Sequence, residues 1–416
     1  MQYPQNRENG REKSKCQRGN KYYFYFPYFY SFSQFRLATN WLGLSLSLFL
    51  GLWLSACGNH STPHQSKNNT SSPKEDETKL TFFGVVLEQF DEVGRPIWKV
   101  RAKEAKYTTD KQMGQAQSPQ GELYQDGKVV YQIKAEKADI KQDGKQLFLE
   151  GKIVATDPRN GITLQGNELE WRPQEDLLIV RNQLNGSHNK LQAIAQEAKV
   201  KTREQRVEFS KGVLAKSTDP QLQMRTEHLI WLIKDDKLFS DRFIQIERYQ
   251  DHKISGRGQG NAAEINLKTQ IAILQPQAKL ELIKPLMEIT SNSITWNIQK
   301  ENITTNSAIR VFKAAENLTI TANQGKMKIP ENTVYLTGNV NAVGQRRQSL
   351  KSNQLTWYFD KKLLEAKGNV IYDQVAPKLT FHGETAIGNL ETENIVVKGG
   401  NSGQKVVTEI IPQENR

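Results

Sequence analysis

The sequence predicts an all-β protein built from antiparallel hairpins, in which a unit of about 30 residues repeats along the chain. The first observation behind this prediction is a set of four tryptophans, Trp171, Trp231, Trp296 and Trp357, spaced 60, 65 and 61 residues apart. The second is that short alternating apolar and polar runs, separated by polar turns, fill the chain from Leu80 onward. Convincing helical periodicity appears nowhere.

Each of the four tryptophans has an aliphatic residue two positions before it. These partners are Leu169, Leu229, Ile294 and Leu355. In an extended strand, residues two apart point to the same face. We therefore expect a row of paired aliphatic and tryptophan side chains along one face of the sheet.

Turn residues between the runs predict hairpins. Asp126-Gly127, Asp143-Gly144 and Asn160-Gly161 separate alternating runs, and these dipeptides favour the primed turns of two-residue hairpins. Ala193 to Val200 is the best helical candidate, but its place in the repeat argues for a strand.

A second motif lies about half a period before the tryptophan frames and ends in a small residue. Successive copies end at Ala138, Ala198, Ala263, Gly325 and Ala386. Small residues at matching places suggest a close approach of neighbouring backbone or a sharp bend. The repeat therefore consists of two strands and two turns, in alternating alanine and tryptophan versions.

On the order of twenty strands cannot remain one flat sheet, so the hairpins are expected to stack and curl into a long two-walled trough. The apolar row would be its core if filled and an apolar groove if left partly open. Strand parity selects the candidate groove residues, and a one-residue shift in register would invert each set. The candidates are Trp98, Leu147, Leu149, Leu169, Trp171, Leu229, Trp231, Ile294, Trp296, Leu355 and Trp357.

Residues 1–57 have the features of an export segment. Residues 1–36 are basic, Leu37 to Ala56 carries no charge, and Leu54-Ser-Ala-Cys57 resembles a bacterial lipobox. Cys57 would then be the acylated first residue of the mature protein. An uncleaved membrane-spanning anchor is the alternative, since about 20 residues just cross a bilayer core. Either anchor leaves the rest of the chain outside the cytoplasm, tethered to the membrane.

Residues 58–79 are polar and predict a flexible linker. The chain has only two cysteines, so no disulfide framework is expected. The formal charge of +12 is partly carried by the leader, and elsewhere lysine and glutamate are interspersed. Nucleic-acid binding needs a concentrated basic patch, and is not expected here.

The segment Phe82 to Ala105, with Gly94, Trp98 and Ala102, resembles the opening of the LptC family of membrane-anchored periplasmic lipopolysaccharide-export proteins. Later alanine- and glycine-bearing units resemble the related OstA/LptA repeat. The resemblance implies an antiparallel twisted-boat or β-jellyroll trough that holds the acyl chains of lipopolysaccharide. It also suggests an LptC-like domain at 80–250 and an OstA/LptA-like continuation at 251–410, which could form one trough.

The same resemblance implies that lipopolysaccharide arrives from an inner-membrane ABC transporter and leaves to an LptA-like bridge protein, docked through sheet edges. The expected location is the periplasmic side of the inner membrane. An exported polysaccharide-binding or adhesin-like module is the alternative. No enzyme, metal or cofactor is expected: Asp139, Glu170 and Glu227 are scattered, and hydrolase and nucleotide-binding motifs are missing from the sequence.

Overall fold

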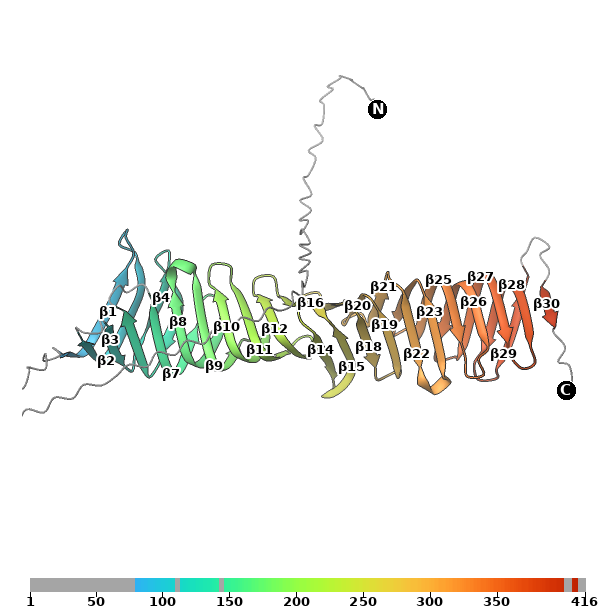
Figure 1. Cartoon of the computed structure of the whole chain (residues 1–416), viewed down its shortest axis with the longest axis horizontal. Helices are drawn as coiled ribbons and strands as arrows, with labels where there is room; N and C mark the ends of the chain where they lie inside the picture. The colour runs from blue at the N-terminus through green and yellow to red at the C-terminus, as the bar shows by residue number, and fades with distance from the viewer. Residues whose placement is uncertain (1–78, 109–112, 142–145, 400–405, 411–416) are drawn as a thin grey trace, which may run out of the picture. The chain divides into compact units, whose positions relative to one another are not determined.

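The computed structural model describes residues 79–108, 113–141, 146–399 and 406–410 of the 416-residue chain. It confirms the all-β prediction. In these ranges thirty strands pair antiparallel into one continuous sheet, and they follow one another in chain order (Figure 1). Two short 3-10 turns, η1 (Pro173–Glu175) and η2 (Ala314–Glu316), interrupt the connections.

The sheet folds on itself into two walls, which we call wall A and wall B. Twelve long strands run through both walls. They are β1 (Lys79–Phe90), β2 (Pro96–Thr108), β7 (Leu147–Thr156), β8 (Thr163–Arg172), β9 (Leu177–Ser187), β10 (Leu191–Lys201), β11 (Arg206–Ser217), β12 (Leu222–Leu232), β25 (Thr333–Val343), β26 (Ser349–Tyr358), β27 (Leu363–Gln374) and β28 (Leu379–Asn389).

The remaining strands are short and belong to one wall. Wall A contains β3 (Met113–Gln117), β6 (Lys137–Lys141), β13 (Lys237–Ser240), β16 (Ala262–Asn266), β17 (Ile271–Gln275), β20 (Ile294–Asn297), β21 (Asn302–Thr305), β24 (Gln324–Lys328) and β29 (Asn394–Lys398). Wall B contains β4 (Gln120–Gln125), β5 (Lys128–Lys134), β14 (Ile244–Gln250), β15 (Lys253–Gly260), β18 (Ala278–Leu282), β19 (Met287–Ser291), β22 (Ile309–Lys313), β23 (Leu318–Ala322) and β30 (Val407–Ile410).

The walls join along a line that we call the seam, where the strand register shifts. Left-handed backbone at Gly151-Lys152, Lys211-Gly212, Gly338-Asn339 and Gly368-Asn369 produces the bend in β7, β11, β25 and β27. Bulges of this kind bend a strand sharply. The apolar side chains on both sides of the bend therefore face one interior.

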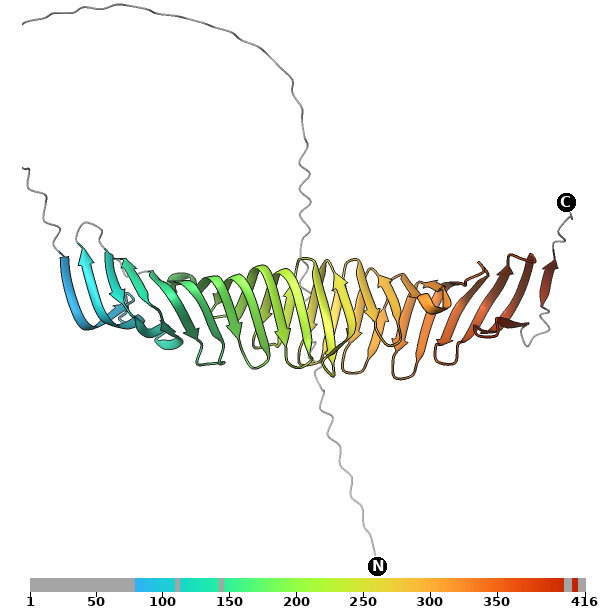
Figure 2. The same ribbon diagram turned by 90° about the horizontal axis from the view of Figure 1, so that it is seen from below.

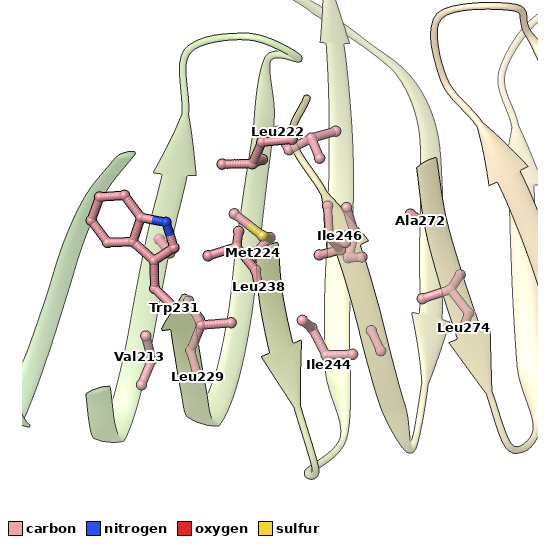
Figure 3. Packing of buried hydrophobic residues seen from close by; sticks show 14 of the residues in the cluster. Val213, Leu222, Met224, Leu229, Trp231, Leu238, Ile244, Ile246, Ala272 and Leu274 are labelled. Carbon is pink, nitrogen blue, oxygen red and sulfur yellow. The ribbon is translucent and has the colours of Figure 1, made fainter. Parts of the chain in front are cut away.

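Away from the seam, both walls end in turns along an edge that we call the mouth. The two layers of strands remain visible when the view is turned (Figure 2). Buried apolar residues of both walls form one cluster between the layers. Figure 3 shows Trp231 and Leu238 of wall A in this cluster with Met224 and Ile246 of wall B.

The structure confirms two of the local predictions made from the sequence and contradicts one. Ala193 to Val200 lies in strand β10, as its place in the repeat indicated. Asp126 and Gly127 both have positive φ, as a primed turn requires. The prediction of a two-residue turn at Asn160-Gly161 is wrong. Residues 157–162 form a longer connection, closed by a hydrogen bond from the backbone N–H of Gly161 to the carbonyl of Asp157.

The sheet continues across the predicted domain boundary, because β14 and β15 pair on either side of Asp251 and His252. The division into 80–250 and 251–410 stays a prediction. Three parts of the sequence prediction lie outside the described residues. They are the turn at Asp143-Gly144, the anchor segment 1–57 with Cys57, and nearly all of the linker 58–79. Within the described ranges, none of the helices is long and apolar enough to cross a membrane.

Candidate functional site: the interior apolar rows

One row of directly paired residues runs through wall A from its first strand to β29. Each residue is the register partner of the next, so neighbours lie about 4.8 Å apart. The row is Leu80, Tyr107, Gly114, Ile140, Leu147, Trp171, Leu178, Val200, Val207, Trp231, Leu238, Ile265, Ala272, Trp296, Ile303, Met327, Val334, Trp357, Leu364, Gly388 and Ile395.

The tryptophan spacing seen in the sequence follows from this row. Trp171, Trp231, Trp296 and Trp357 are each four strands apart, and Tyr107 occupies the corresponding place before them. The four tryptophans are at most 2% exposed. The repeat therefore places one large aromatic side chain in the interior about every 19 Å.

A second row lies two residues closer to the seam. It contains the predicted partners Leu169, Leu229, Ile294 and Leu355, together with the candidate Leu149, all buried. The small residues that end the alanine-type motif also lie here: Ala138 pairs with Leu149, Ala198 with Phe209, Ala263 with Leu274, Gly325 with Leu336, and Ala386 with Val397. Small side chains thus meet large ones close to the bend.

Trp98 differs from the other tryptophans. It lies in the wall B part of β2, where it pairs with Leu123, and it faces the interior from the opposite wall. All eleven residues predicted as groove lining are therefore buried between the walls. Their burial agrees with the strand parity inferred from the sequence, and their role as a groove lining stays a prediction.

Wall B supplies small residues opposite the large ones of wall A. A Cβ atom at Gly256 would lie 3.3 Å from the Trp296 ring, and one at Gly186 would lie 3.1 Å from Phe209. Both contacts are tighter than ordinary van der Waals packing. Glycine is therefore needed in wall B where an aromatic ring from wall A reaches across.

The interior offers almost no polar partners. The ring N–H groups of Trp171, Trp231, Trp296 and Trp357 are buried without a hydrogen-bond acceptor, as is the hydroxyl of Tyr131. Burial raises the pKa of Tyr131 well above its usual range. Unpaired buried donors are uncommon. The surroundings of these five side chains are therefore mainly apolar.

The interior opens near the C-terminal end of the described sheet. A cavity of about 420 Å³ lies there between turns of both walls. This volume is typical of a small ligand site. Burial raises the pKa of Tyr372, which faces the cavity. The lining is mixed. Its apolar residues are Ala315, Leu318, Ala342, Leu350, Leu364, Tyr372, Leu390 and Ile395, and its polar residues include Glu316, Gln348, Lys362, Glu391 and Glu393.

Both ends of the sheet expose apolar side chains. In β1, Phe83 is 76% exposed, and Val86 is exposed as well. In β29, Val396 is exposed. Among the described strands β1 pairs with β2 alone and β29 with β28 alone, so each carries one free backbone edge. Such edges readily accept another strand.

Glu170, one of the acidic residues considered in the sequence, is held by two arginines. Glu170 lies on the outer face of wall A, where Arg172 and Arg181 bind its carboxylate. Desolvation would raise its pKa, but hydrogen bonds from the two guanidinium groups outweigh this and lower it. A general acid needs the opposite shift. In the described part, no group of three His, Cys, Asp or Glu residues could hold a metal ion.

The comparisons with known proteins agree with this architecture. The family model described as Lipopolysaccharide-assembly, LptC-related matches residues 44–179, 164–282 and 308–404, more than half of the chain. The chain belongs to this family. No curated protein matches it. The LptC-related chain therefore has a role in lipopolysaccharide transport, as a component of a transport and binding family associated with the periplasmic side of the inner membrane.

The sequence did not reveal two parts of this LptC-related interior. The C-terminal cavity is formed by residues from several strands and turns, and only an extension of the tryptophan parity to Leu364 could have located part of it. The glycines of wall B were also missed. Their meaning depends on which side chain lies opposite, and one strand's own sequence does not show this.

Proposed function

We propose that the chain is a membrane-anchored periplasmic adaptor that accepts lipopolysaccharide from an inner-membrane ABC transporter and passes it toward the outer membrane. The acyl chains would travel between the walls, along the interior rows that contain the eleven predicted residues. The observation that carries this proposal is the unbroken row from Leu80 to Ile395, since a path for lipid must be continuous. Family membership supports the choice of cargo.

The energetics favour an apolar path. Burial of an acyl chain contributes about 0.8 kcal/mol per methylene, and the apolar side of the C-terminal cavity could take part of such a chain. Elsewhere the two walls are in contact through their side chains. An acyl chain there would have to replace contacts such as that between Trp296 and Gly256.

Anchoring belongs to the same proposal. The acylated Cys57, or alternatively an uncleaved span at residues 37–56, would hold the N-terminal end of the sheet near the membrane. Replacement of Cys57 by Ser tests this choice. Loss of membrane association supports acylation, whereas unchanged association supports the spanning anchor.

The two free strand edges are proposed docking sites. The edge of β1 would face the transporter complex, and the C-terminal edge would accept an LptA-like bridge protein by strand addition. Removal of the chain from Leu379 onward deletes β28 and its partners β29 and β30. This truncation should spare anchoring and block transfer to the bridge protein; normal transfer would refute C-terminal docking.

The cargo is tested directly by purification from membranes. Lipopolysaccharide should co-purify with the protein, and a photoreactive residue at Trp171 or Trp231 should form an adduct with it. Absence of both would rule out the transport role.

A polysaccharide-binding module is the second candidate. A hollow of about 790 Å³ on the outer face of wall B favours it, with a lining that includes Gln259, Lys279, Asn292, Asn323 and Asn339. Amides suit hydroxyl-rich ligands because they both donate and accept hydrogen bonds. Co-purification of a lipid-free glycan, with no interior adduct, would favour this alternative.

A further inference from the structure

Polar contacts join the two walls across the mouth. In each of them a side chain of one wall reaches a turn or a strand end of the other. The Arg159 guanidinium donates to the Thr202 carbonyl at 3.1 Å, and Lys190 pairs with Asp236 at 2.7 Å. Further along, the Gln270 amide donates to Asp219 at 2.9 Å. We call these contacts, together with the pair between Arg248 and Glu301, the mouth clasps.

The mouth clasps recur regularly. The partners are 43, 46 and 51 residues apart in the first three contacts, and the pair between Arg248 and Glu301 continues the series at 2.9 Å. In each of these four contacts, a turn or strand end of wall B meets a turn of wall A that follows 43 to 53 residues later in the chain. A recurring offset of this kind follows from the repeat of the fold.

Behind the clasps the interior is filled. The His188 ring, in a wall B turn next to Lys190, lies 5.1 Å from the Trp231 ring of wall A. His188 also contacts the carbonyl of Asn160 at 3.1 Å. A lipid tail at Trp231 would therefore have to displace His188 and part the turns that Lys190 and Asp236 join.

The C-terminal end is different. There the cavity lies between the two lines of turns, and its cross-mouth contact, Arg346 with Glu393 at 2.9 Å, involves highly exposed side chains. Lys313 lies between the two regions. Its ammonium group contacts the Trp357 ring at 5.6 Å and the carboxylate of Glu316 at 2.6 Å. An open cavity thus adjoins a closed, clasped section.

We propose that the mouth clasps act as a gate on the lipid path. When closed, they confine a lipid tail to the C-terminal cavity, and they must open one after another for a tail to occupy the middle of the interior. This inference rests on the proposed lipid-carrying function. Ion pairs at the surface are individually weak because solvent screens them. Burial of a long apolar tail is strongly favourable. The free energy gained by this burial can therefore offset the loss of a few such contacts at one place.

The test uses the full chain in detergent micelles with radiolabelled lipopolysaccharide. Lys190→Cys and Asp236→Cys are joined by a short bis-methanethiosulfonate linker, which a reducing agent releases. A photoreactive aromatic residue replaces Trp231 in one preparation and Tyr372 in another. The matched control joins Gln223→Cys and Glu247→Cys, which are register partners within wall B. The control has the same native cysteines.

Joining Lys190→Cys to Asp236→Cys should lower the lipid adduct at position 231 by at least tenfold and leave the adduct at position 372 unchanged. Reduction should restore the first adduct, and the control bridge should change neither. An unchanged adduct at position 231 would overturn the gate. Equal loss at both positions would overturn it too, because the clasp would then control binding as a whole. No adduct at either position in the unbridged protein would remove the proposed lipid function, and the gate with it.

A second variant checks the gate from the other direction. Lys190→Asp places two carboxylates at the same clasp, and like charges repel. The adduct at position 231 should rise several-fold, with the strand content by circular dichroism unchanged. A fall in this adduct with strand content preserved would contradict the gate.

Discussion

Replacement of Trp296 by alanine should strongly weaken the middle of the sheet. The side chain is fully buried, and its ring lies against Gly256 of the opposite wall. Burial of roughly 200 Å² at about 25 cal/mol per Å² contributes about 5 kcal/mol. Loss of the unpartnered ring N–H returns about 1 to 2 kcal/mol. We therefore expect a local loss of about 3 to 4 kcal/mol, which agrees with large-to-small substitutions in other protein cores.

Native-state hydrogen exchange is the suitable assay for Trp296→Ala, because a repetitive sheet opens in local units. The amides of β17 and β20 should lose protection, since Ala272 and Trp296 are register partners. Tyr335→Ala is the matched control, because Tyr335 is an exposed aromatic residue of the same sheet. A loss at β17 and β20 of less than about 1 kcal/mol would show that the ring does not fill the interior.

Three further predictions concern the seam and the mouth. In a denaturant titration, Gly368→Ala should destabilise the sheet by about 1 to 2 kcal/mol. The reason is that φ of Gly368 is +78° and a Cβ there would lie 2.8 Å from the Asn353 amide nitrogen. The control Gly114→Ala has open space around it and should have little effect in the same titration. Burial lowers the pKa of His188 below its ordinary 6.5, so the unfolded chain binds this proton more readily and stability should fall as pH drops through 6.5. His188→Gln should flatten that part of the unfolding profile, and an unchanged slope would contradict the assignment. A hydrogen bond from Arg203 lowers the pKa of Asp126, so Arg203→Ala should raise it in a carboxyl NMR titration, with a smaller difference at high salt.

The tryptophan rows could be predicted from sequence because strand parity is a local property. Each aliphatic partner is two residues from its tryptophan, and all eight lie inside as expected. The wall of Trp98 could not be predicted, since parity alone does not say which of two walls a strand segment joins. The turn at Asn160 depends on Asp157, whose carboxylate is bound by Arg159 and Asn160 in a longer loop.

The mouth clasps had no local signal. Their partners are polar and separated by more than forty residues, so neither periodicity nor a short motif links them. They follow from the way two walls fold together, which depends on every bend along the seam. The sequence likewise did not predict that the interior is filled, because the filling depends on glycines of wall B that face aromatic rings of wall A.

The central claim is that lipid tails pass between the walls, and a photocrosslinking scan along β26 tests it most directly. A photoreactive residue is placed in turn at Gln354, Leu355, Thr356 and Trp357, where exposed or half-exposed positions alternate with buried ones. Adducts with lipopolysaccharide should form at Leu355 and Trp357 and be nearly absent at Gln354 and Thr356. Equal adducts at all four positions, or adducts confined to the two outer ones, would contradict an interior lipid path.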